Sequence, residues 1–505
     1  EVGVRRFLAK PVDMRLLEAI PLSGSEDAPV VCLVERRRGQ QQEASAHFVM
    51  PATVRGDALR DLEARAPGSV LGRTEDSEGA EAAGVVDGFE SAQAVSDLAR
   101  FMSSAHDKHG EHGALSARVY APKSGRTALG SAPDACRLML ASPHSLCWSL
   151  GNQGFMKIFR SLEEGGNPEL EMLQALGGMG FPGVPRLIAS LAYKKRRSSG
   201  MTLAIVQEYL QGAEDGRAFV EQALLQLSER VLASGEQALD VTAVPVLTPP
   251  ELPAAQQDII GGYALDFFRR LGERAAALHE ALARVQGPSF QPEPFSALYL
   301  RSCYQGIRNL AHQAQGMLER RQPSQAGEDK KLPLAAVLKH AGKLTRLRPS
   351  GMRIRIHGDF QLDNVLHKGK DLYIVDFDGD VRLPLGERTI KRSPLRDVAS
   401  MLVSLGVSVA GSRHLLPMPV AVDEARLAAW IALWRRCAGH AFLQAYMRQT
   451  DGGALLPDSR EDAFVLLEVF LLEQLLRRII RDAESGGEES GVLLDMVEAF
   501  LRVFP

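Results

Sequence analysis

The apolar positions in the first 211 residues fall into short runs. "MRLLEAIPL" and "PVVCLVERR" lie within residues 1–100, and "SLCWSL", "FMKIFR" and "LAIVQEYL" lie between residues 126 and 211. Such runs between Gly, Ser and Pro are typical of β-strands. A single helix is predicted among them at "NPELEMLQALGGMG", where Asn167 can cap the helix, Pro168 suits its first position and glycines end it. The first part of the chain is therefore predicted to be β-rich, with a small separate subdomain at its start.

The later part of the chain shows helical spacing instead. In "DFFRRLGERAAALHEALARV" the apolar residues Phe267, Phe268, Leu271, Ala275, Leu278 and Leu282 share one face. The Pro-rich segment 232–256 before it predicts a loop or insertion. A hairpin is predicted within residues 354–381, and helices are predicted from Ser393 to the end.

Composition limits the class of protein. A chain of 505 residues predicts two or three lobes, and 45% hydrophobic with 24% charged residues is ordinary for a globular protein. A net charge of −3 gives no basic field, so nucleic acid is not predicted as a partner. The apolar run "AFVLLEVFLLEQLL" is short and carries Glu468 and Glu473, so no membrane association is predicted.

The cysteines indicate a reducing compartment. The five cysteines are scattered and form no CxxC pair, which argues against a disulfide framework or a zinc site. A cytoplasmic location is therefore predicted. The chain begins at Glu1 rather than at Met, so it can be a fragment of a longer polypeptide.

The stretch "IRIHGDFQLDNVLHKGKDLYIVDFDGDV", residues 354–381, concentrates carboxylates. Asp359 and Asn364 are separated by a loop, and the strand "LYIV" is predicted to return Asp376 beside them. Oxygen ligands of this kind suit Mg²⁺. Phosphoryl transfer needs an Asp that orients and deprotonates a hydroxyl, plus an Asn and an Asp that hold the metal. Two plain turns are the alternative for any single residue, but the complete pattern favours a metal-nucleotide site.

Candidate nucleotide-binding residues lie upstream. Lys157 in "FMKIFR" points away from its apolar neighbours on a predicted strand, and Glu171 on the next helix is predicted to pair with it. "SPHSLCWSLG" would cover the phosphates, but it lacks GxGxxG, so backbone N–H groups and the hydroxyls of Ser142 or Ser145 would make the contacts. An ordinary hairpin turn is an equally good reading of that segment.

"VQEYLQG" is predicted to connect the lobes and to offer backbone groups to adenine, through Gln207, Glu208 and Tyr209. Supporting roles are predicted for four further residues: His357, Asp378, Arg396 and Asp397. His357 would brace the catalytic loop. Asp397 would accept hydrogen bonds from a neighbouring loop or, in the simpler reading, only complement a helix dipole.

These stretches together resemble the aminoglycoside-phosphotransferase-like branch of the eukaryotic-type kinase fold, and within it the bacterial maltokinases, including those fused to trehalose synthase. The matching segments occur in the family's order over most of residues 140–480, and they include "MKIFRSLEEGGNPELE", "LAIVQEYLQGAEDG", "LGERAAALHEALA", "IRIHGDFQLDNVL", "LYIVDFDGDVRLPLGERTIKRSPLRDVASML" and "FLLEQLL". "VRRFLAKPVDMRLLEAIPL" is similar to the start of the family's N-terminal cap.

The resemblance implies an α+β, bilobal protein-kinase-like fold. Its parts would be a cap subdomain (1–110), an N-lobe (111–210) and a helical C-lobe (211–505). It also implies that Asp359 is the catalytic base and that Asn364 and Asp376 bind Mg²⁺. Lys157 with its partner Glu171 would bind the phosphates of ATP. The implied reaction converts maltose and ATP to maltose 1-phosphate and ADP in trehalose and glycogen metabolism, in covalent or non-covalent association with trehalose synthase.

The chain departs from the family in its catalytic loop and at its C-terminal end, and the second departure leaves the acceptor open. The family usually has His-Leu-Gly-Gln where this chain has Gln361-Leu362-Asp363-Asn364, although Asn364 restores the general kinase metal ligand. "QLLRRIIRDAESGGEESG" has neither Tyr nor Trp, the residues on which a disaccharide normally stacks. The alternatives are another sugar, an amino sugar such as glucosamine, or an aminoglycoside, for which Asp363 and Asp380 could line the site. A pseudokinase-like binding module attached to a carbohydrate enzyme is the alternative from another class.

Overall fold

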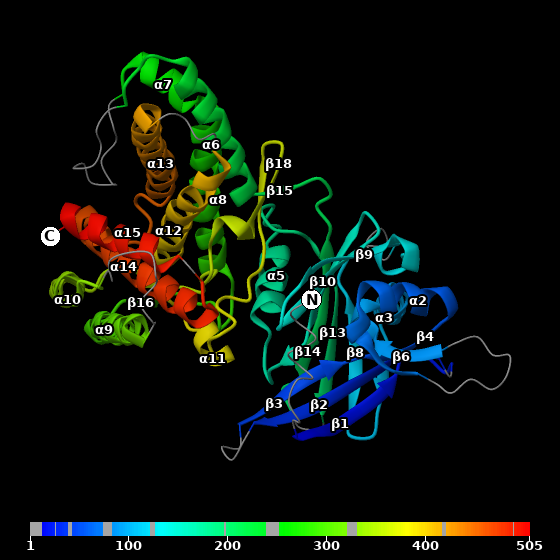
Figure 1. Ribbon diagram of the computed structural model, residues 1–505. Coiled ribbons are helices and arrows are strands. Elements are labelled where there is room, and N and C mark those ends of the chain that lie inside the picture. The colour runs from blue at the N-terminus through cyan, green and yellow to red at the C-terminus, as the bar shows by residue number, and fades with distance from the viewer. Residues whose placement is uncertain are drawn as a thin grey trace. The chain divides into compact units, whose positions relative to one another are not determined.

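The computed structural model describes residues 13–25, 27–38, 43–73, 83–121, 127–195, 198–238, 252–320, 331–416, 421–487 and 489–504. The chain divides into two compact units (Figure 1). Unit 1 comprises Glu1–Gly178, Val184–Gly212 and Val381–Leu385, and unit 2 comprises Met179–Gly183, Ala213–Asp380 and Gly386–Pro505. Residues 1–12 of the predicted cap lie outside the described residues, as do residues 239–251 of the predicted Pro-rich loop.

Unit 1 is built around a seven-stranded antiparallel sheet in the order β7-β8-β13-β14-β11-β10-β9. Its strands are β7 (Asp107–His109), β8 (Gly113–Val119), β9 (Cys136–Ala141), β10 (Ser145–Leu150), β11 (Gly154–Phe159), β13 (Leu187–Lys195) and β14 (Met201–Glu208). The strands β11 and β14 are buried over almost their whole length. This explains their nearly continuous apolar sequences, because such strands are covered on both faces.

Unit 1 also contains two smaller sheets and several helices. One sheet has the order β1-β2-β3-β12 and the other the order β4-β6-β5. Their strands are β1 (Asp13–Pro21), β2 (Val30–Arg38), β3 (Glu43–Val49), β12 (Ser161–Leu162), β4 (Pro51–Arg55), β5 (Val70–Arg73) and β6 (Ala83–Asp87). The helices are α2 (Gly56–Arg65), α3 (Ala92–Ser103) and α5 (Pro168–Gly178). The predicted subdomain boundary at residue 110 falls inside the β7–β8 hairpin.

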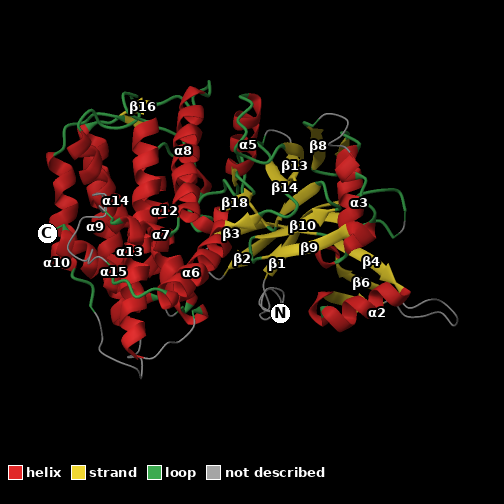
Figure 2. Ribbon diagram, turned by 90° about the horizontal axis from the view of Figure 1, so that it is seen from above, coloured by secondary structure: helices red, strands yellow, loops and turns green. Residues whose placement is uncertain are grey.

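Helices dominate after residue 213 (Figure 2). They are α6 (Gly216–Ala233), α7 (Ala254–Ile260), α8 (Gly262–Arg284), α9 (Ala297–Arg320), α10 (Leu334–Ala341), α11 (Leu385–Arg388), α12 (Leu395–Gly411), α13 (Ala421–Gln449), α14 (Arg460–Ser485) and α15 (Ser490–Val503). The strands here are β15 (Glu214–Asp215), β16 (Glu293–Pro294), β17 (Met352–Arg353), β18 (Val365–Lys368) and β19 (Asp371–Ile374). The hairpin predicted within residues 354–381 is β18–β19.

The core of unit 2 forms where α8 packs against α13. All six residues predicted for the apolar face of α8 are buried. Phe268 contacts Trp434 of α13 edge-on, with ring centroids 5.9 Å apart. Within the described residues one helical segment, Leu395–Leu415, is long and apolar enough to cross a membrane, and 67% of its apolar 18-residue window is buried inside the protein. Burial of this kind is what a core helix shows.

Candidate functional site

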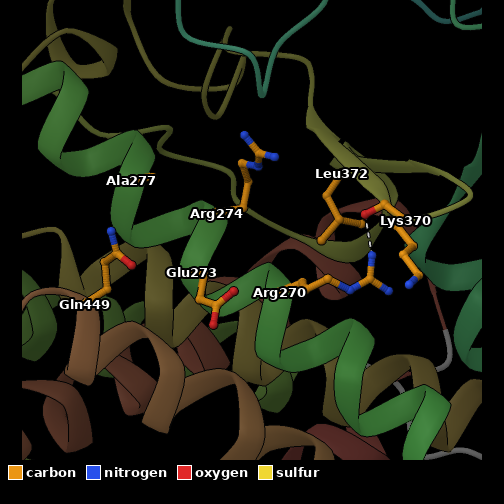
Figure 3. Close-up of a pocket in the computed structure, with 7 residues that line it drawn as sticks. All are labelled: Arg270, Glu273, Arg274, Ala277, Lys370, Leu372 and Gln449. Atoms are coloured by element: carbon orange, nitrogen blue, oxygen red, sulfur yellow. Dashed lines mark hydrogen bonds between the residues drawn. The ribbon is translucent and has the colours of Figure 1, made fainter.

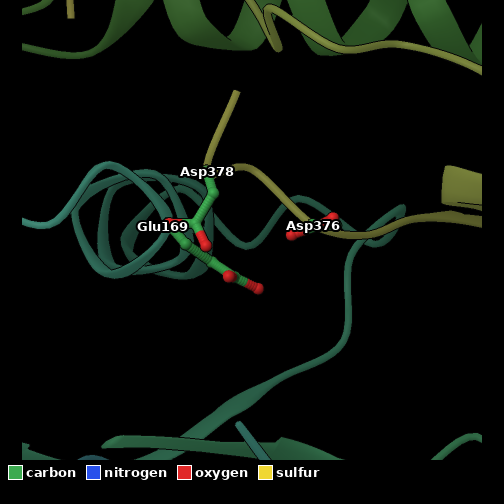
Figure 4. Close-up of side chains that lie close together, drawn as sticks. All are labelled: Glu169, Asp376 and Asp378. Carbon is green, nitrogen blue, oxygen red and sulfur yellow. The ribbon is translucent and has the colours of Figure 1, made fainter. Parts of the chain in front are cut away.

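The β18–β19 hairpin brings the predicted metal ligands together. Val365 pairs with Ile374, and the Val375 N–H donates to the carbonyl of Asn364 over 3.0 Å. Asp376 therefore follows directly on the strand that lies beside Asn364, as the sequence predicts. Asp376 adopts the left-handed region with φ of 65°, which Asp tolerates better than most residues. Asp376 and Asp378 both project from the loop after β19 (Figure 4).

Both carboxylate oxygens of Asp359 have side-chain partners. The Gln361 Nε2 donates to Oδ2 over 3.0 Å, and the Arg481 Nη2 lies 3.4 Å from Oδ1. Burial raises the pKa of the Asp359 carboxyl above its usual range; Arg481 and His357 oppose this effect, while Asp380 and Asp376 add to it. A general base is most efficient when its pKa lies near the working pH, so a raised pKa suits a carboxylate to this role at neutral pH.

The backbone before Asp359 is braced by Asp397 of α12. The Asp397 carboxylate accepts hydrogen bonds from the N–H groups of His357 (2.7 Å) and Gly358 (3.0 Å), and from the Nε2 of His279 (3.1 Å). The Nε2 of His357 donates to the carbonyl of Val375 over 3.0 Å, and its Nδ1 accepts from the N–H of Asp359 over 3.3 Å. These contacts fix the His357 tautomer with the proton on Nε2. His357 and Asp397 thus hold the loop in place.

We expect the Asp397 carboxylate to stabilise the fold in a pH-dependent way. Burial alone would raise the pKa of Asp397, but the hydrogen bonds from His279 and the loop outweigh it and place that pKa below its usual range. A lowered pKa means that the contribution is present above the unfolded value, about 3.9, and is lost as pH falls through the folded value. Asp397→Asn should therefore reduce the free energy of unfolding by about 1–3 kcal/mol at pH 7.

Urea unfolding of both proteins between pH 7 and pH 3 measures this difference, which should shrink below pH 4. Asp371→Asn, at the exposed start of β19, is the matched control. A difference that stays constant across the pH range would show that the Asp397 charge contributes nothing.

Lys157 on β11 is buried and forms an ion pair with Glu169. Its Nζ lies 2.7 Å from Oε2 of Glu169, and the two side chains are only 10% and 1% exposed. The partner predicted from the sequence was Glu171, and its contact with Lys157 stays a prediction. Residues two apart on a helix point about 200° apart, so Glu169 and Glu171 lie on different faces of α5. Glu169 on α5 (Figure 4) lies on the buried stripe with Met172, Leu173 and Leu176.

The predicted cap of α5 is present, because the N–H of Leu170 donates to Oδ1 of Asn167 over 2.8 Å.

At the predicted phosphate loop, the N–H of Ser142 donates to the carbonyl of Ser145 over 2.8 Å, and the N–H of Ser145 donates back to Oγ of Ser142 over 3.0 Å. These bonds close an ordinary hairpin turn between β9 and β10. A phosphate contact by Ser145 stays a prediction.

The segment predicted to bind adenine already uses two of its backbone N–H groups. Glu208 donates to the carbonyl of Arg186, and Tyr209 donates to the carbonyl of Gln153, each over 2.9 Å. The ring of Tyr209 stacks on Phe155 with centroids 6.5 Å apart. Gln207 is buried within β14. Adenine would therefore have to form hydrogen bonds with groups of this segment other than the N–H groups of Glu208 and Tyr209.

Arg396 supports the scaffold rather than a ligand. Its Nη1 lies 2.8 Å from Oε1 of Glu473, and its guanidinium lies over the ring of Phe470 at 4.9 Å. Burial disfavours the charged form, yet the Glu473 carboxylate raises the pKa of Arg396 overall. The ion pair joins α12 to α14 in the interior of unit 2.

A pocket of about 310 Å³ lies elsewhere in unit 2 (Figure 3). Its lining comprises Arg270, Glu273, Arg274, Ala277, Lys370, Leu372 and Gln449. The guanidinium of Arg270 donates to the carbonyl of Lys370. None of the residues predicted for catalysis or metal binding lines this pocket, so it is not the candidate reaction site.

Residues 154–440, more than half of the chain, match the phosphotransferase enzyme family known as APH. The chain belongs to this family. The loop that carries Asp359, the β18–β19 hairpin and Lys157 all lie inside the matched region. The enzyme class expected from the sequence, a phosphotransferase, is confirmed by this membership.

Named relatives of this APH-family chain are glucosamine kinases. A glucosamine kinase of Streptacidiphilus jiangxiensis is 29% identical over 283 residues, which are 56% of this chain and 54% of the relative. The match thus spans about half the length of that relative. The structure is similar to a glucosamine kinase in complex with glucosamine, ADP and inorganic phosphate, with a TM-score of 0.60, 21% identity and coverage of 98% of this chain and 94% of the other. A second crystal form gives a TM-score of 0.61 at 20% identity, covering 99% and 94%.

These structural matches confirm the predicted α+β fold class, with a β-rich N-terminal region and a helical C-terminal region. The sequence analysis did not single out Glu169 or the arginines near the loop that carries Asp359. Arg481 contacts Asp359, Arg478 contacts Gln361, and Arg217 pairs with Asp363 over 2.9 Å. Arg478 and Arg481 are three residues apart and therefore share a helix face, which was the available signal.

Proposed function

We propose that this APH-family protein is an ATP-dependent kinase that phosphorylates a hydroxyl group of a sugar, with glucosamine as the first acceptor to test. The observation that carries the proposal is Asp359, a largely buried carboxylate held at both oxygens, on a loop braced by Asp397 and followed by Asn364. Phosphoryl transfer depends on positioning and electrostatics more than on covalent chemistry, and this loop supplies positioning.

Asp359 would orient the acceptor hydroxyl and take its proton. Each carboxylate oxygen has two lone pairs, so the bonds from Gln361 and Arg481 leave acceptor capacity for the hydroxyl. In unit 1, the ammonium of Lys157, held by Glu169, would bind nucleotide phosphates.

Asn364 and Asp376 fit Mg²⁺ by the chemistry of their donors. The Nδ2 of Asn364 donates to the carbonyl of Asp359 over 2.9 Å, which assigns Oδ1 as the atom that remains for a cation. An amide oxygen and a carboxylate are hard ligands of the kind that Mg²⁺ takes alongside phosphate and water. Mg²⁺ bound there would neutralise charge on the phosphates.

Two observations bear on the acceptor. The named relatives act as glucosamine kinases, and the ammonium of glucosamine would call for a carboxylate. Asp363, which lies 2.9 Å from Arg217, and Asp380, which lies 3.9 Å from Arg481, are the two carboxylates predicted to face such an ammonium. Maltose is the second candidate, because "PLGER" and "SPLRDVASML" resemble maltokinases, and an association with trehalose synthase would follow from that resemblance.

A panel of acceptors with Mg-ATP tests the proposal. It contains glucosamine, N-acetylglucosamine, glucose, maltose and an aminoglycoside, and ADP release is measured for each. We expect kcat/KM for glucosamine to exceed that for N-acetylglucosamine by about tenfold or more, because acetylation removes a charge that a nearby carboxylate stabilises by about 1–3 kcal/mol. Highest activity with maltose would replace glucosamine as the acceptor, and activity with no member of the panel would contradict the proposal.

A further inference from the structure

Helix α14 contacts the catalytic carboxylate by two routes. The first is direct, because the Nη2 of Arg481 lies 3.4 Å from Oδ1 of Asp359. The second runs through Gln361, whose Nε2 donates to Oδ2 of Asp359 over 3.0 Å, while its Oε1 accepts from the Nη1 of Arg478 over 3.5 Å. Two arginines one helical turn apart therefore act on the two oxygens of one carboxylate. Arg481 contacts Oδ1 directly, and Arg478 contacts the Gln361 side chain that bonds to Oδ2. We refer to Arg478, Arg481 and Gln361 as the α14 clamp.

The end of α14 that carries these arginines is fixed on its other sides. Leu475, Leu476, Ile479 and Ile480 are buried. In the last turn of α14, the carboxylate of Asp482 accepts hydrogen bonds from the N–H groups of Glu489 and Ser490, each over 3.0 Å, and so anchors the start of α15. The Nε of Arg478 in turn lies 3.5 Å from Oε2 of Glu489. The arginines thus project from a backbone that is held by packing and by hydrogen bonds.

We infer that the α14 clamp positions Asp359 for the attack of the acceptor hydroxyl, which makes Arg481 and Arg478 positioning residues of the proposed kinase reaction. A carboxylate held at one oxygen can still rotate about its terminal torsion, whereas contacts at both oxygens fix the plane of the group. Fixing that plane directs the remaining lone pairs at one point. A displacement of about 1 Å at a reacting group can cost about 10²-fold in rate.

Kinetics of Arg481→Gln and Arg478→Gln test this inference, which rests on the proposed function. We expect kcat to fall by about 10- to 100-fold in each variant, with KM for ATP unchanged. Arg481→Lys should recover part of the loss, because it keeps the charge at Oδ1. Arg460→Gln is the matched control at the other end of α14, where the side chain is 70% exposed and pairs with Asp451, and it should leave kcat unchanged. Variants that match this control, or that raise KM for the acceptor with kcat intact, would overturn the inference.

A second measurement does not depend on turnover. Double-mutant cycles of unfolding free energy for Asp359→Ala with Arg481→Ala, and for Gln361→Ala with Arg478→Ala, report whether each contact exists in solution. We expect each pair to be coupled by about threefold in the unfolding equilibrium constant. Absence of coupling in both cycles overturns the α14 clamp even if the enzyme is active. An inactive wild-type protein with coupled pairs would instead contradict only the proposed function.

Discussion

Replacing Asp359 with Asn should lower kcat by about 10³-fold for any acceptor that the protein phosphorylates. Asn keeps the size of the side chain, and its single oxygen can still accept from Gln361 or from Arg481, but it cannot take a proton from a hydroxyl. Burial raises the pKa of Asp359, which means that the folded protein holds its charge at a cost. The neutral Asn removes that cost, so we expect the melting temperature of Asp359→Asn to equal or exceed that of the wild type.

The measurements are ADP release and thermal unfolding with and without Mg-ATP. Because Asp359 acts on the acceptor, ATP should raise the melting temperature of the variant as much as that of the wild type. Turnover within tenfold of the wild type would show that another group is the base. A wild type that is stabilised by Mg-ATP, but has no more turnover than the variant with any acceptor, would favour the binding module instead.

The sequence predicts best which residues lie close together where those residues are neighbours along the chain. Asp359, Asn364 and Asp376 lie within one loop and one hairpin, and strand alternation with turn residues is enough to bring them together. The burial of Glu169 could also be predicted from the sequence, since its spacing to Met172, Leu173 and Leu176 marks the buried face of α5.

The contact of Arg481 with Asp359 could not be predicted from the sequence. The two residues are 122 positions apart, and nothing in the local pattern of α14 indicates which loop its polar face meets. The same limit applies to the sheets. Strands could be predicted one by one, but the pairing of β12 with β3, or of β13 with β8, depends on tertiary packing that alternation does not encode.

Replacing Glu169 with Gln should produce the largest loss of stability among these variants. Both side chains of the ion pair between Lys157 and Glu169 are buried, and the substitution takes the Glu169 charge away from a buried ammonium in unit 1. Breaking a buried pair in this way costs about 3–5 kcal/mol of the free energy of unfolding. The affinity for ATP should fall as well, because the ammonium of Lys157 loses the group that orients it.

Glu171→Gln is the matched control, since it makes the same chemical change two residues later on α5, at a half-buried position off the buried stripe. We expect it to change the free energy of unfolding by less than about 1 kcal/mol. Urea unfolding and ATP titration of both variants decide which carboxylate serves Lys157. The double variant Lys157→Met with Glu169→Gln should be more stable than Glu169→Gln alone, because removing the ammonium also removes the buried charge. If Glu171→Gln were instead the damaging change, the pairing with Glu169 would be wrong, and the partner of Lys157 would be the one predicted from the sequence.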